Sequence, residues 1–274
     1  MARTITSLQN PRVKSAVRLR RHRAREGQQR VIIDGVRELA LATRAGIQVL
    51  EVFVCPELLG DEGRQLADAL TRGPAEVWNV TQPVFEKLAF GQRAEGLVAI
   101  AQRPKASLED IAIGNDSLIV VLEAVEKPGN VGAVLRTADG AGAGALVVAD
   151  PRTDLYNPNT IRASLGAVFT VPTAAATGAE ALAWLRAHGA AIFAARVDGD
   201  ILYTDVSFCG RCAIVLGNEA EGLSPVWQGP DVTAIRLPMH GVVDSLNVSA
   251  AAAVVLYEAL RQRSAMERRA GRPV

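Results

Sequence analysis

The sequence contains few of the residues that mark an extracellular or metal-binding protein. It has three cysteines in 274 residues, Cys55, Cys209 and Cys212. Three thiols cannot form a disulfide framework, so a reducing compartment is expected. Cys209 and Cys212 form a lone CxxC pair, whereas a structural zinc site needs four ligands and no second pair exists. We therefore expect no metal and interpret both cysteines as structural.

Long apolar segments are also missing. The N-terminus is charged and has no apolar core like that of a signal peptide. The most apolar run, residues 248–256, is far too short to cross a bilayer. Apolar residues nevertheless make up 49% of the chain, which is ample for a buried core. The sequence therefore indicates a cytoplasmic globular protein with no membrane segment and with one large or two ordinary domains.

Net charge is small, but it is unevenly distributed. The chain carries +1 overall, yet residues 1–30 hold nine Arg or Lys against one acid and residues 261–274 hold five against one. Residues 31–260 are left with a net charge of −11. Basic ends on an acidic body are typical of a protein that binds a polyanion, although solvated tails would give the same pattern. Most of these basic residues are arginines, which suit phosphate groups.

The first part of the chain predicts a small α/β domain. Residues 1–27 form a basic arm, either helical or disordered, and residues 104–116 form a polar linker. Between them, residues 28–103 alternate strand-like and helix-like segments, which is the pattern of an α/β unit. The predicted strands are residues 30–34, 49–54, 76–80 and 97–101, and the predicted helices are residues 36–45, 64–71 and 83–90.

A second α/β series occupies residues 117–274. The predicted strands are residues 117–122, 145–149, 169–172, 190–195, 213–217 and 233–238, and the predicted helices are residues 131–141, 160–165, 179–187 and 246–262. Several of these strands are continuous apolar runs, which indicate a parallel sheet covered on both faces. The fold class is therefore α/β, and a ligand is expected at the carboxyl ends of the strands.

One glycine-rich segment follows the strand at residues 117–122. Asn130 is placed to cap the next helix, and Arg136 lies at the edge of its apolar stripe, where an ordinary surface arginine would also fit. The run GAGAG at residues 140–144 is not a dinucleotide-binding loop, because it follows a helix and leads into a strand. It is better interpreted as a helix end and a tight turn.

Two further segments combine glycines with polar residues at strand ends. After the strand at 213–217, Gly217 lets a ligand approach the backbone and Glu219 follows directly, although a plain connecting loop would give the same pattern. After the strand at 233–238, a loop carries His240, Asp244 and Ser245. Asp244 or Ser245 could simply cap the final helix, and we interpret His240 as a loop histidine without a catalytic role.

Together these segments resemble the three signature motifs of the SpoU/TrmH methyltransferases in the SPOUT superfamily. The matching pieces are NVGAVLRTA at residues 130–138, LGNEAEGLS at 216–224 and LPMHGVVDSLNVS at 237–249. They agree in residue type, order and spacing, and the resemblance covers residues 117–262. The segments VIIDGVRE at 31–38 and EGLVAI at 95–100 resemble, with lower specificity, the L30e-like substrate-binding domain often attached to this family.

The resemblance implies a deep C-terminal trefoil knot and a homodimer that binds S-adenosylmethionine in the knot loops. By position, backbone groups at Gly217, Leu237 and Leu246 would hold the cofactor, and Leu216 and Met239 would pack beside it. The implied activity is methyl transfer to a ribose 2′-hydroxyl of RNA. A separate N-terminal domain favours 23S ribosomal RNA, and no membrane or metal is involved.

The resemblance also makes Arg136 the essential arginine. A guanidinium stays protonated, so we expect it to bind a phosphate and stabilise the forming alkoxide rather than act as a free base. Asn130 would orient the nucleotide or Arg136, and Glu219 would fix the loop or pair with Arg136. Ser245 and Asn247 would contact the ribose or phosphate, or shape the cofactor loop.

Three alternatives stay open from the sequence. The substrate could be transfer RNA, because close relatives modify it. The chain could also be a catalytically silent RNA-binding or ribosome-assembly protein of the same fold, although intact Arg136, Glu219, Ser245 and Asn247 argue against this. A nicotinamide-dependent enzyme is disfavoured by the reversed order of the glycine-rich run.

Overall fold

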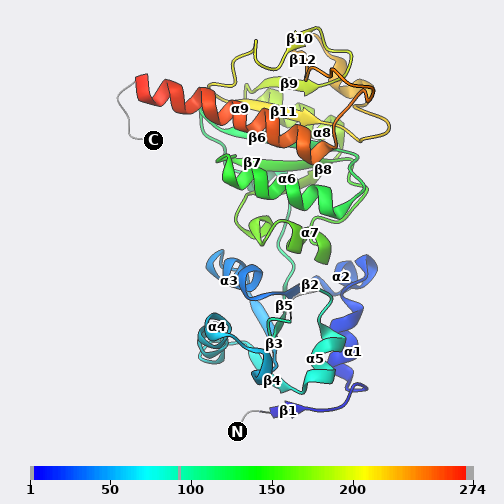
Figure 1. The fold of residues 1–274 in the computed structure, drawn as a ribbon, viewed down its shortest axis with the longest axis vertical. Coiled ribbons are helices and arrows are strands. Elements are labelled where there is room, and N and C mark those ends of the chain that lie inside the picture. Colours follow the sequence, from blue (N-terminus) through cyan, green and yellow to red (C-terminus); the bar gives the residue numbers. More distant parts are fainter. Residues whose placement is uncertain (1–2, 92–93, 270–274) are drawn as a thin grey trace. The chain divides into compact units, whose positions relative to one another are not determined.

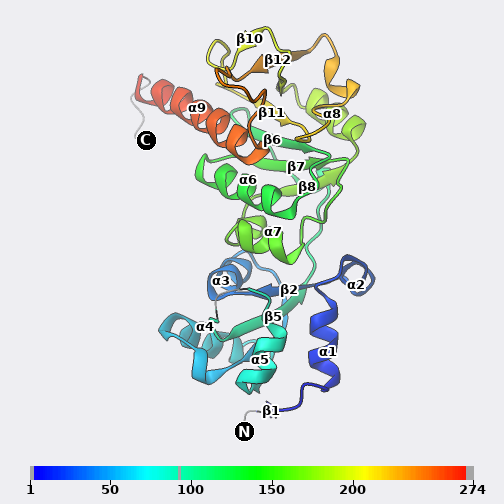
Figure 2. The same cartoon turned by 45° about the vertical axis from the view of Figure 1, so that its right-hand side comes forward.

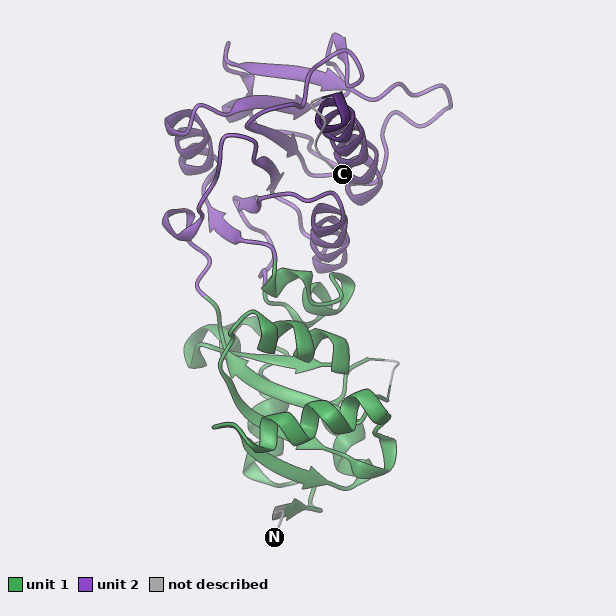
Figure 3. Ribbon diagram, turned by 90° about the vertical axis from the view of Figure 1, so that its left-hand side faces the viewer, with its two compact units in different colours: residues 1–104, 156–170 green, residues 105–155, 171–274 purple. Residues whose placement is uncertain are grey.

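The computed structural model describes residues 3–91 and 94–269 (Figure 1). Residues 1–2 and 270–274, which include Arg272 of the predicted basic C-terminus, lie outside the described residues. The chain divides into two compact units (Figure 3). The first unit is Met1–Pro104 with Tyr156–Thr170, and the second is Lys105–Leu155 with Val171–Val274. The chain thus leaves the second unit once, adds a short segment to the first, and returns.

The first unit contains a five-stranded mixed sheet. Its strands are β1 (Arg3–Ile5), β2 (Arg30–Asp34), β3 (Val49–Val54), β4 (Glu76–Val80) and β5 (Leu97–Gln102), in the order β1-β4-β3-β5-β2. β5 runs antiparallel to both of its neighbours. The helices are α1 (Pro11–Arg18), α2 (His22–Gln28), α3 (Val36–Arg44), α4 (Asp61–Thr71), α5 (Gln82–Leu88) and α7 (Pro158–Ala163), with 3-10 turns η1 (Pro56–Leu58) and η3 (Ala167–Phe169). The predicted strands are confirmed, and the three-residue β1 is too short to give a sequence signal.

The basic N-terminal segment forms helices that pack on this sheet. α1 begins where the Asn10 side chain accepts a hydrogen bond from the Arg12 backbone N–H at 2.9 Å, with a proline at the first helical position. Val13, Ala16 and Leu19 recur every third residue, and all three are fully buried in the core of the first unit. The helical alternative therefore holds for residues 11–28.

The second unit contains a seven-stranded sheet in which every pairing is parallel. The strands are β6 (Leu118–Glu123), β7 (Ala145–Ala149), β8 (Thr173–Ala176), β9 (Ala191–Ala195), β10 (Ile201–Leu202), β11 (Cys212–Leu216) and β12 (Val232–Arg236), in the order β10-β12-β9-β11-β6-β7-β8. Every residue of β6, β7 and β11 is buried, as the continuous apolar runs predicted.

One strand prediction in this unit is wrong. The segment 169–172 is not a strand, because η3 ends at Phe169 and β8 begins at Thr173. Pro172 has no backbone N–H to donate to a sheet, although its carbonyl accepts a hydrogen bond from Leu146 at 2.9 Å. The apolar run therefore leads into the strand instead of forming it.

The helices of the second unit are α6 (Pro128–Gly140), α8 (Gly178–Ala187) and α9 (Val248–Arg269), with 3-10 turns η2 (Leu108–Asp110) and η4 (Pro225–Gln228). α6 and α9 lie side by side (Figure 1, Figure 2). α8 places Leu182 and Leu185 in a core cluster with Ile119, Val121 and Trp227. The knot implied by the resemblance stays a prediction.

Two predicted helix starts need correction. α6 begins at Pro128, so Asn130 lies in its first turn and is not the N-cap residue. Proline is well suited to that first position because its missing N–H would be unpaired there anyway. α9 begins at Val248, and Asn247, not Asp244 or Ser245, accepts from the Ser249 backbone N–H at 3.0 Å. These starts place Asn130 and Asn247 beside the candidate site.

The strand order creates a point where the loops diverge. From β6 the chain proceeds through β7 to β8 on one side, whereas β11 pairs with the opposite side of β6. Loops that leave neighbouring strands in opposite directions open a crevice at their carboxyl ends.

Within the described ranges, no helix combines the length and apolarity needed to span a membrane. The same residues contain no group of three or more His, Cys, Asp or Glu that could hold a metal ion.

Candidate active site

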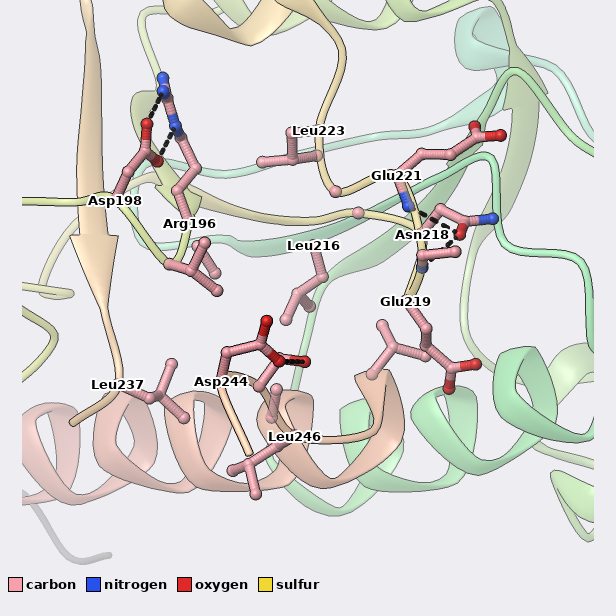
Figure 4. A pocket seen from close by; sticks show the side chains of 18 of the residues that line it. Arg196, Asp198, Leu216, Asn218, Glu219, Glu221, Leu223, Leu237, Asp244 and Leu246 are labelled. Carbon is pink, nitrogen blue, oxygen red and sulfur yellow. Dashed lines mark hydrogen bonds and ion pairs between the residues drawn. The ribbon is translucent and has the colours of Figure 1, made fainter. Parts of the chain in front are cut away.

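A cavity of about 540 Å³ lies at the carboxyl ends of β9, β11 and β12 (Figure 4). Its walls come from the loops that follow these three neighbouring strands and from the start of α9. The cavity is lined by all the residues predicted to bind the cofactor, which are Leu216, Gly217, Leu237, Met239 and Leu246. Glu219 and Ser245 line it as well. The cavity therefore gathers parts of two separated motifs.

The loop after β11 folds back on itself. Asn218 and Gly222 exchange backbone hydrogen bonds at 2.9 and 3.1 Å, and Gly222 adopts a positive φ of 69°. A Cβ at Gly217 would lie 2.3 Å from the carbonyl oxygen of Gly222. The missing side chain of Gly217 therefore leaves room for the returning backbone of the same loop, and the expected approach of a ligand at this residue stays a prediction.

A buried carboxylate that the sequence analysis did not single out anchors this loop. Glu123, at the end of β6, is 2% exposed. It accepts hydrogen bonds from the Ser224 backbone N–H at 2.7 Å, the Ser224 hydroxyl at 2.6 Å and the Trp227 indole N–H at 2.8 Å. The signal was an acid directly after a fully buried strand, since such a group must find donors.

Glu219 brings together two other predicted residues. Its carboxylate accepts hydrogen bonds from the Asn130 amide at 2.7 Å and from the Asn247 amide, and it forms an ion pair with Lys127 at 3.5 Å. The first and third motifs are thus both hydrogen-bonded to the Glu219 carboxylate of the second motif. Within the described residues of this chain, Glu219 forms an ion pair with Lys127 and none with Arg136.

Arg136 and Ser245 differ in their surroundings. Arg136 is exposed on α6 and is not among the residues that line the cavity. No hydrogen bond or ion pair joins its guanidinium to another of the described side chains. Ser245 lines the cavity and donates from its hydroxyl to Asp244 at 3.2 Å. His240 is exposed and lies outside the cavity lining.

Two ion-pair groups at the cavity were also missed. Arg196 holds Asp198 through two hydrogen bonds of 2.9 and 2.6 Å, which lowers the pKa of that carboxyl. Arg152 bridges Glu126 at 2.8 Å and Glu221 at 2.5 Å, and its hydrogen bond lowers the pKa of Glu221. Arg152 thereby ties the loop after β6 to the loop after β11, but its sequence position belongs to no motif.

The lining fits the predicted cofactor in size and charge. Cavities for small molecules commonly enclose about 300–1,000 Å³ with a mostly apolar wall and a few polar groups. Here apolar side chains lie beside four carboxylates and one guanidinium, so the lining carries an excess of negative charge. Such a lining suits a cationic ligand that also has apolar parts, as S-adenosylmethionine has.

Comparisons with known proteins agree with this geometry. The model of the SpoU rRNA Methylase family matches residues 117–257, and that of the MRM3-like substrate binding domain matches residues 10–99. The 23S rRNA (uridine(2479)-2'-O)-methyltransferase of Streptomyces viridochromogenes is 32% identical over 242 residues, which cover 85% of this chain and 76% of that protein. The 23S rRNA (guanosine(2553)-2'-O)-methyltransferase RlmP of Bacillus subtilis is 25% identical, covering 92% and 97%.

Solved structures give the same result. A crystal structure of an RNA 2'-O ribose methyltransferase is 41% identical with a TM-score of 0.84, covering 94% of this chain and 98% of that one. The S-adenosylmethionine-bound rRNA methyltransferase of Sinorhizobium meliloti is 28% identical with a TM-score of 0.86, covering 95% and 98%. These matches confirm the α/β fold and the family expected from the motifs. The chain belongs to the SpoU rRNA methylase family.

Proposed function

We propose that this protein transfers the methyl group of S-adenosylmethionine to a ribose 2′-hydroxyl of 23S ribosomal RNA. The observation that carries the proposal is the cavity, in which two signature motifs converge on a space of suitable size and charge. Family membership supports the reaction type, and relatives named for 23S rRNA support that substrate over the transfer RNA alternative.

The cofactor would be held by residues of the two loops after β11 and β12. Backbone groups at Gly217, Leu237 and Leu246 would bind its polar edges, and the side chains of Leu216 and Met239 would pack beside them. When bound, the cofactor supplies a methyl group on a positively charged sulfur. Its carbon–sulfur bond would be exchanged for the new carbon–oxygen bond, and the residues around the cavity would have to hold the ribose oxygen beside that methyl group while the hydroxyl proton leaves.

Arg136 would act on the RNA. A ribose hydroxyl is a weak nucleophile at neutral pH, so the enzyme must position it and favour its deprotonated form. The Arg136 guanidinium is exposed and remains charged, which suits binding of the neighbouring phosphate and stabilisation of the forming alkoxide. Asn130, Glu219 and Asn247 would keep the surrounding loops in place through their shared hydrogen bonds. Ser245 would contact the ribose or shape the cofactor loop.

A homodimer would complete the site. Arg136 lies outside the cavity lining of its own chain, so we infer that it serves the cavity of a second copy. The exposed apolar side chains of Val254 and Tyr257 on α9 support an interface near α6, against which α9 packs. Symmetric pairs of identical subunits are the commonest oligomers.

The test of this proposal is the Arg136→Ala variant. We expect methyl transfer to 23S rRNA to fall at least about a hundredfold, because one charged stabilising group is removed. Binding of S-adenosylmethionine, measured by calorimetry, should stay at the wild-type level. Near-wild-type transfer by this variant would refute the assignment of Arg136.

Mixing two inactive variants tests the dimer. Gly217→Val should lose cofactor binding, because even the first side-chain carbon would collide with the Gly222 carbonyl. If Arg136 acts across subunits, a mixture of Arg136→Ala and Gly217→Val chains should regain about a quarter of the wild-type sites. A mixture that stays inactive, although its chains exchange, would mean that each chain uses its own arginine.

The first unit would bind the RNA outside the reaction centre. Lys14, Arg18, Arg21 and Arg23 are exposed on or beside α1 and α2. The match to a substrate-binding domain model supports this role, as does the attraction of phosphates to clustered cations. A cytoplasmic location follows from the ribosomal substrate and agrees with three unpaired cysteines.

A further inference from the structure

The carboxylates that line the cavity do not all have a positively charged partner. Four of them face it, from Asp198, Glu219, Glu221 and Asp244, against the single guanidinium of Arg196. An uncompensated carboxylate inside a ligand cavity loses favourable hydration when the ligand displaces water. The ligand must therefore supply a positive charge wherever the protein does not.

Three of these carboxylates have a cationic partner within the second unit. Asp198 is held by Arg196, and Glu221 is held by Arg152 at 2.5 Å. Glu219 pairs with Lys127 at 3.5 Å and receives two amide hydrogen bonds as well. These groups are already used to fix the loops, and a ligand does not need to neutralise them.

Asp244 is the exception among the lining carboxylates. Its Oδ1 accepts a hydrogen bond of 3.2 Å from the neutral Ser245 hydroxyl, and no Lys, Arg or His of the described residues forms an ion pair with it. Asp244 is an exposed residue of the cavity lining, and in the view of Figure 4 its side chain lies between those of Leu216 and Leu246. Because leucines line the same cavity as Asp244, a bound cation would meet both a negative charge and apolar surroundings.

We propose that the Asp244 carboxylate recognises a positively charged group of the cofactor, either the sulfonium or the α-ammonium. This inference rests on the proposed function and adds a specificity determinant to it. The RNA cannot supply the missing charge, because its phosphates are anions. A bound cofactor would displace water from Asp244 and so strengthen the attraction.

Calorimetric binding to the full-length protein tests the proposal with three ligands. S-adenosylmethionine carries both cations, S-adenosylhomocysteine keeps only the ammonium, and 5′-methylthioadenosine has neither. For Asp244→Asn, the Kd of S-adenosylmethionine should rise roughly tenfold, as expected for loss of one charge-assisted hydrogen bond or ion pair. The Kd of 5′-methylthioadenosine should stay unchanged. An unchanged Kd for S-adenosylhomocysteine would identify the sulfonium, and a parallel rise would identify the ammonium.

Two further variants separate charge from shape. Asp244→Glu keeps the charge and should bind S-adenosylmethionine more tightly than Asp244→Asn does. Asp205→Asn is the matched control, because Asp205 is also exposed and accepts a 3.2 Å hydrogen bond from the neighbouring Thr204 hydroxyl but lies outside the cavity lining. This control should bind all three ligands like the wild type.

The outcomes distinguish this proposal from the proposed function. Wild-type affinity of Asp244→Asn for S-adenosylmethionine would overturn the role of Asp244 and leave the methyltransferase intact. Equal weakening of all three ligands would also overturn it, because a distorted cavity does not discriminate by charge. If the wild-type protein bound no S-adenosylmethionine, the proposed function itself would fail.

Discussion

In the second unit a buried carboxylate anchors a loop, and in the first unit a buried guanidinium does so. Glu123 accepts three hydrogen bonds and ties the loop after β11 to the end of β6. In the first unit, the fully buried Arg25 donates to the Leu19 carbonyl, and Arg20 donates to three carbonyls at the end of α5 at 2.6–2.9 Å. Opposite charges therefore perform the same structural task.

This comparison shows that charge in a sequence is not the same as charge offered to a ligand. Arg12 pairs with Glu51 at 2.7 Å and with Glu76 at 3.0 Å, and Arg30 also pairs with Glu51, at 3.9 Å. With Arg20 and Arg25, four of the nine basic residues in the first thirty therefore hold the fold. Among the lining carboxylates of the second unit, three likewise stabilise loops. In both units, the remaining charged groups are the candidates for binding RNA or cofactor.

The largest expected effect comes from removing the carboxylate anchor. Glu123→Ala would leave the buried Trp227 indole N–H and both half-buried Ser224 donors without their acceptor, which should lower the free energy of unfolding by about 4 kcal/mol. Because the loop after β11 lines the cavity, affinity for S-adenosylmethionine should fall as well. Urea unfolding and calorimetry measure the two effects.

The matched control for Glu123 is Ser224→Ala. This change removes one of the three hydrogen bonds and keeps the carboxylate, so the expected loss is about 1 kcal/mol. A Glu123→Ala protein as stable as Ser224→Ala would mean that water replaces the carboxylate and that the anchor is not essential.

The arginines of the first unit should separate into two groups. Arg25→Ala should lower the free energy of unfolding by about 2 kcal/mol without changing how RNA affinity depends on salt. The double change Arg21→Ala with Arg23→Ala should keep stability within about 0.5 kcal/mol. It should also reduce the salt slope of binding to single-stranded RNA by about 0.7 log units for each phosphate that the variant no longer binds.

Arg44→Ala is the control for this separation, because Arg44 is exposed on α3, away from the two N-terminal helices. It should change neither stability nor the salt slope. If Arg44→Ala weakened RNA binding as much as the double variant, the first unit would attract RNA over its whole surface. The distinction between structural and binding arginines would then disappear.

Much of the site could be predicted because its motifs are local. The short patterns around Gly217, Leu237 and Leu246 specify strand ends and turns, and those loops line the cavity. Glu123 and Arg152 could not be assigned in the same way. Their partners lie 101 and 69 positions further along the chain, and only the folded sheet brings them together.

The strand boundaries show the same limit. Continuous apolar runs predicted β6, β7 and β11 well, because burial on both faces leaves a strong composition signal. β1 has only three residues and gives no such signal. β8 begins at Thr173, just after the segment 169–172 that was predicted as a strand, because that apolar run ends in a proline. α6 begins at Pro128 and not after Asn130, because a proline fits the first helical position as well as an asparagine fits the cap.

The smallest expected effect concerns a buried carboxylate in the first unit, Asp34. Asp34 is 3% exposed and accepts from the Phe90 and Gly91 backbone N–H groups at 2.9 and 3.0 Å, with Arg162 at 3.4 Å. Burial raises the pKa of Asp34 above its ordinary value, and these three donors oppose the rise only in part.

The sign of the pH dependence follows from that shift. A carboxyl that holds its proton more tightly when folded stabilises the folded state at low pH, and this contribution is lost as the pH rises from the unfolded pKa through the folded one. An asparagine side chain cannot titrate, so Asp34→Asn should gain stability relative to the wild type between about pH 4 and pH 7. Urea unfolding of both proteins across this range measures the difference. The opposite trend would mean that Arg162 and the two amides outweigh burial.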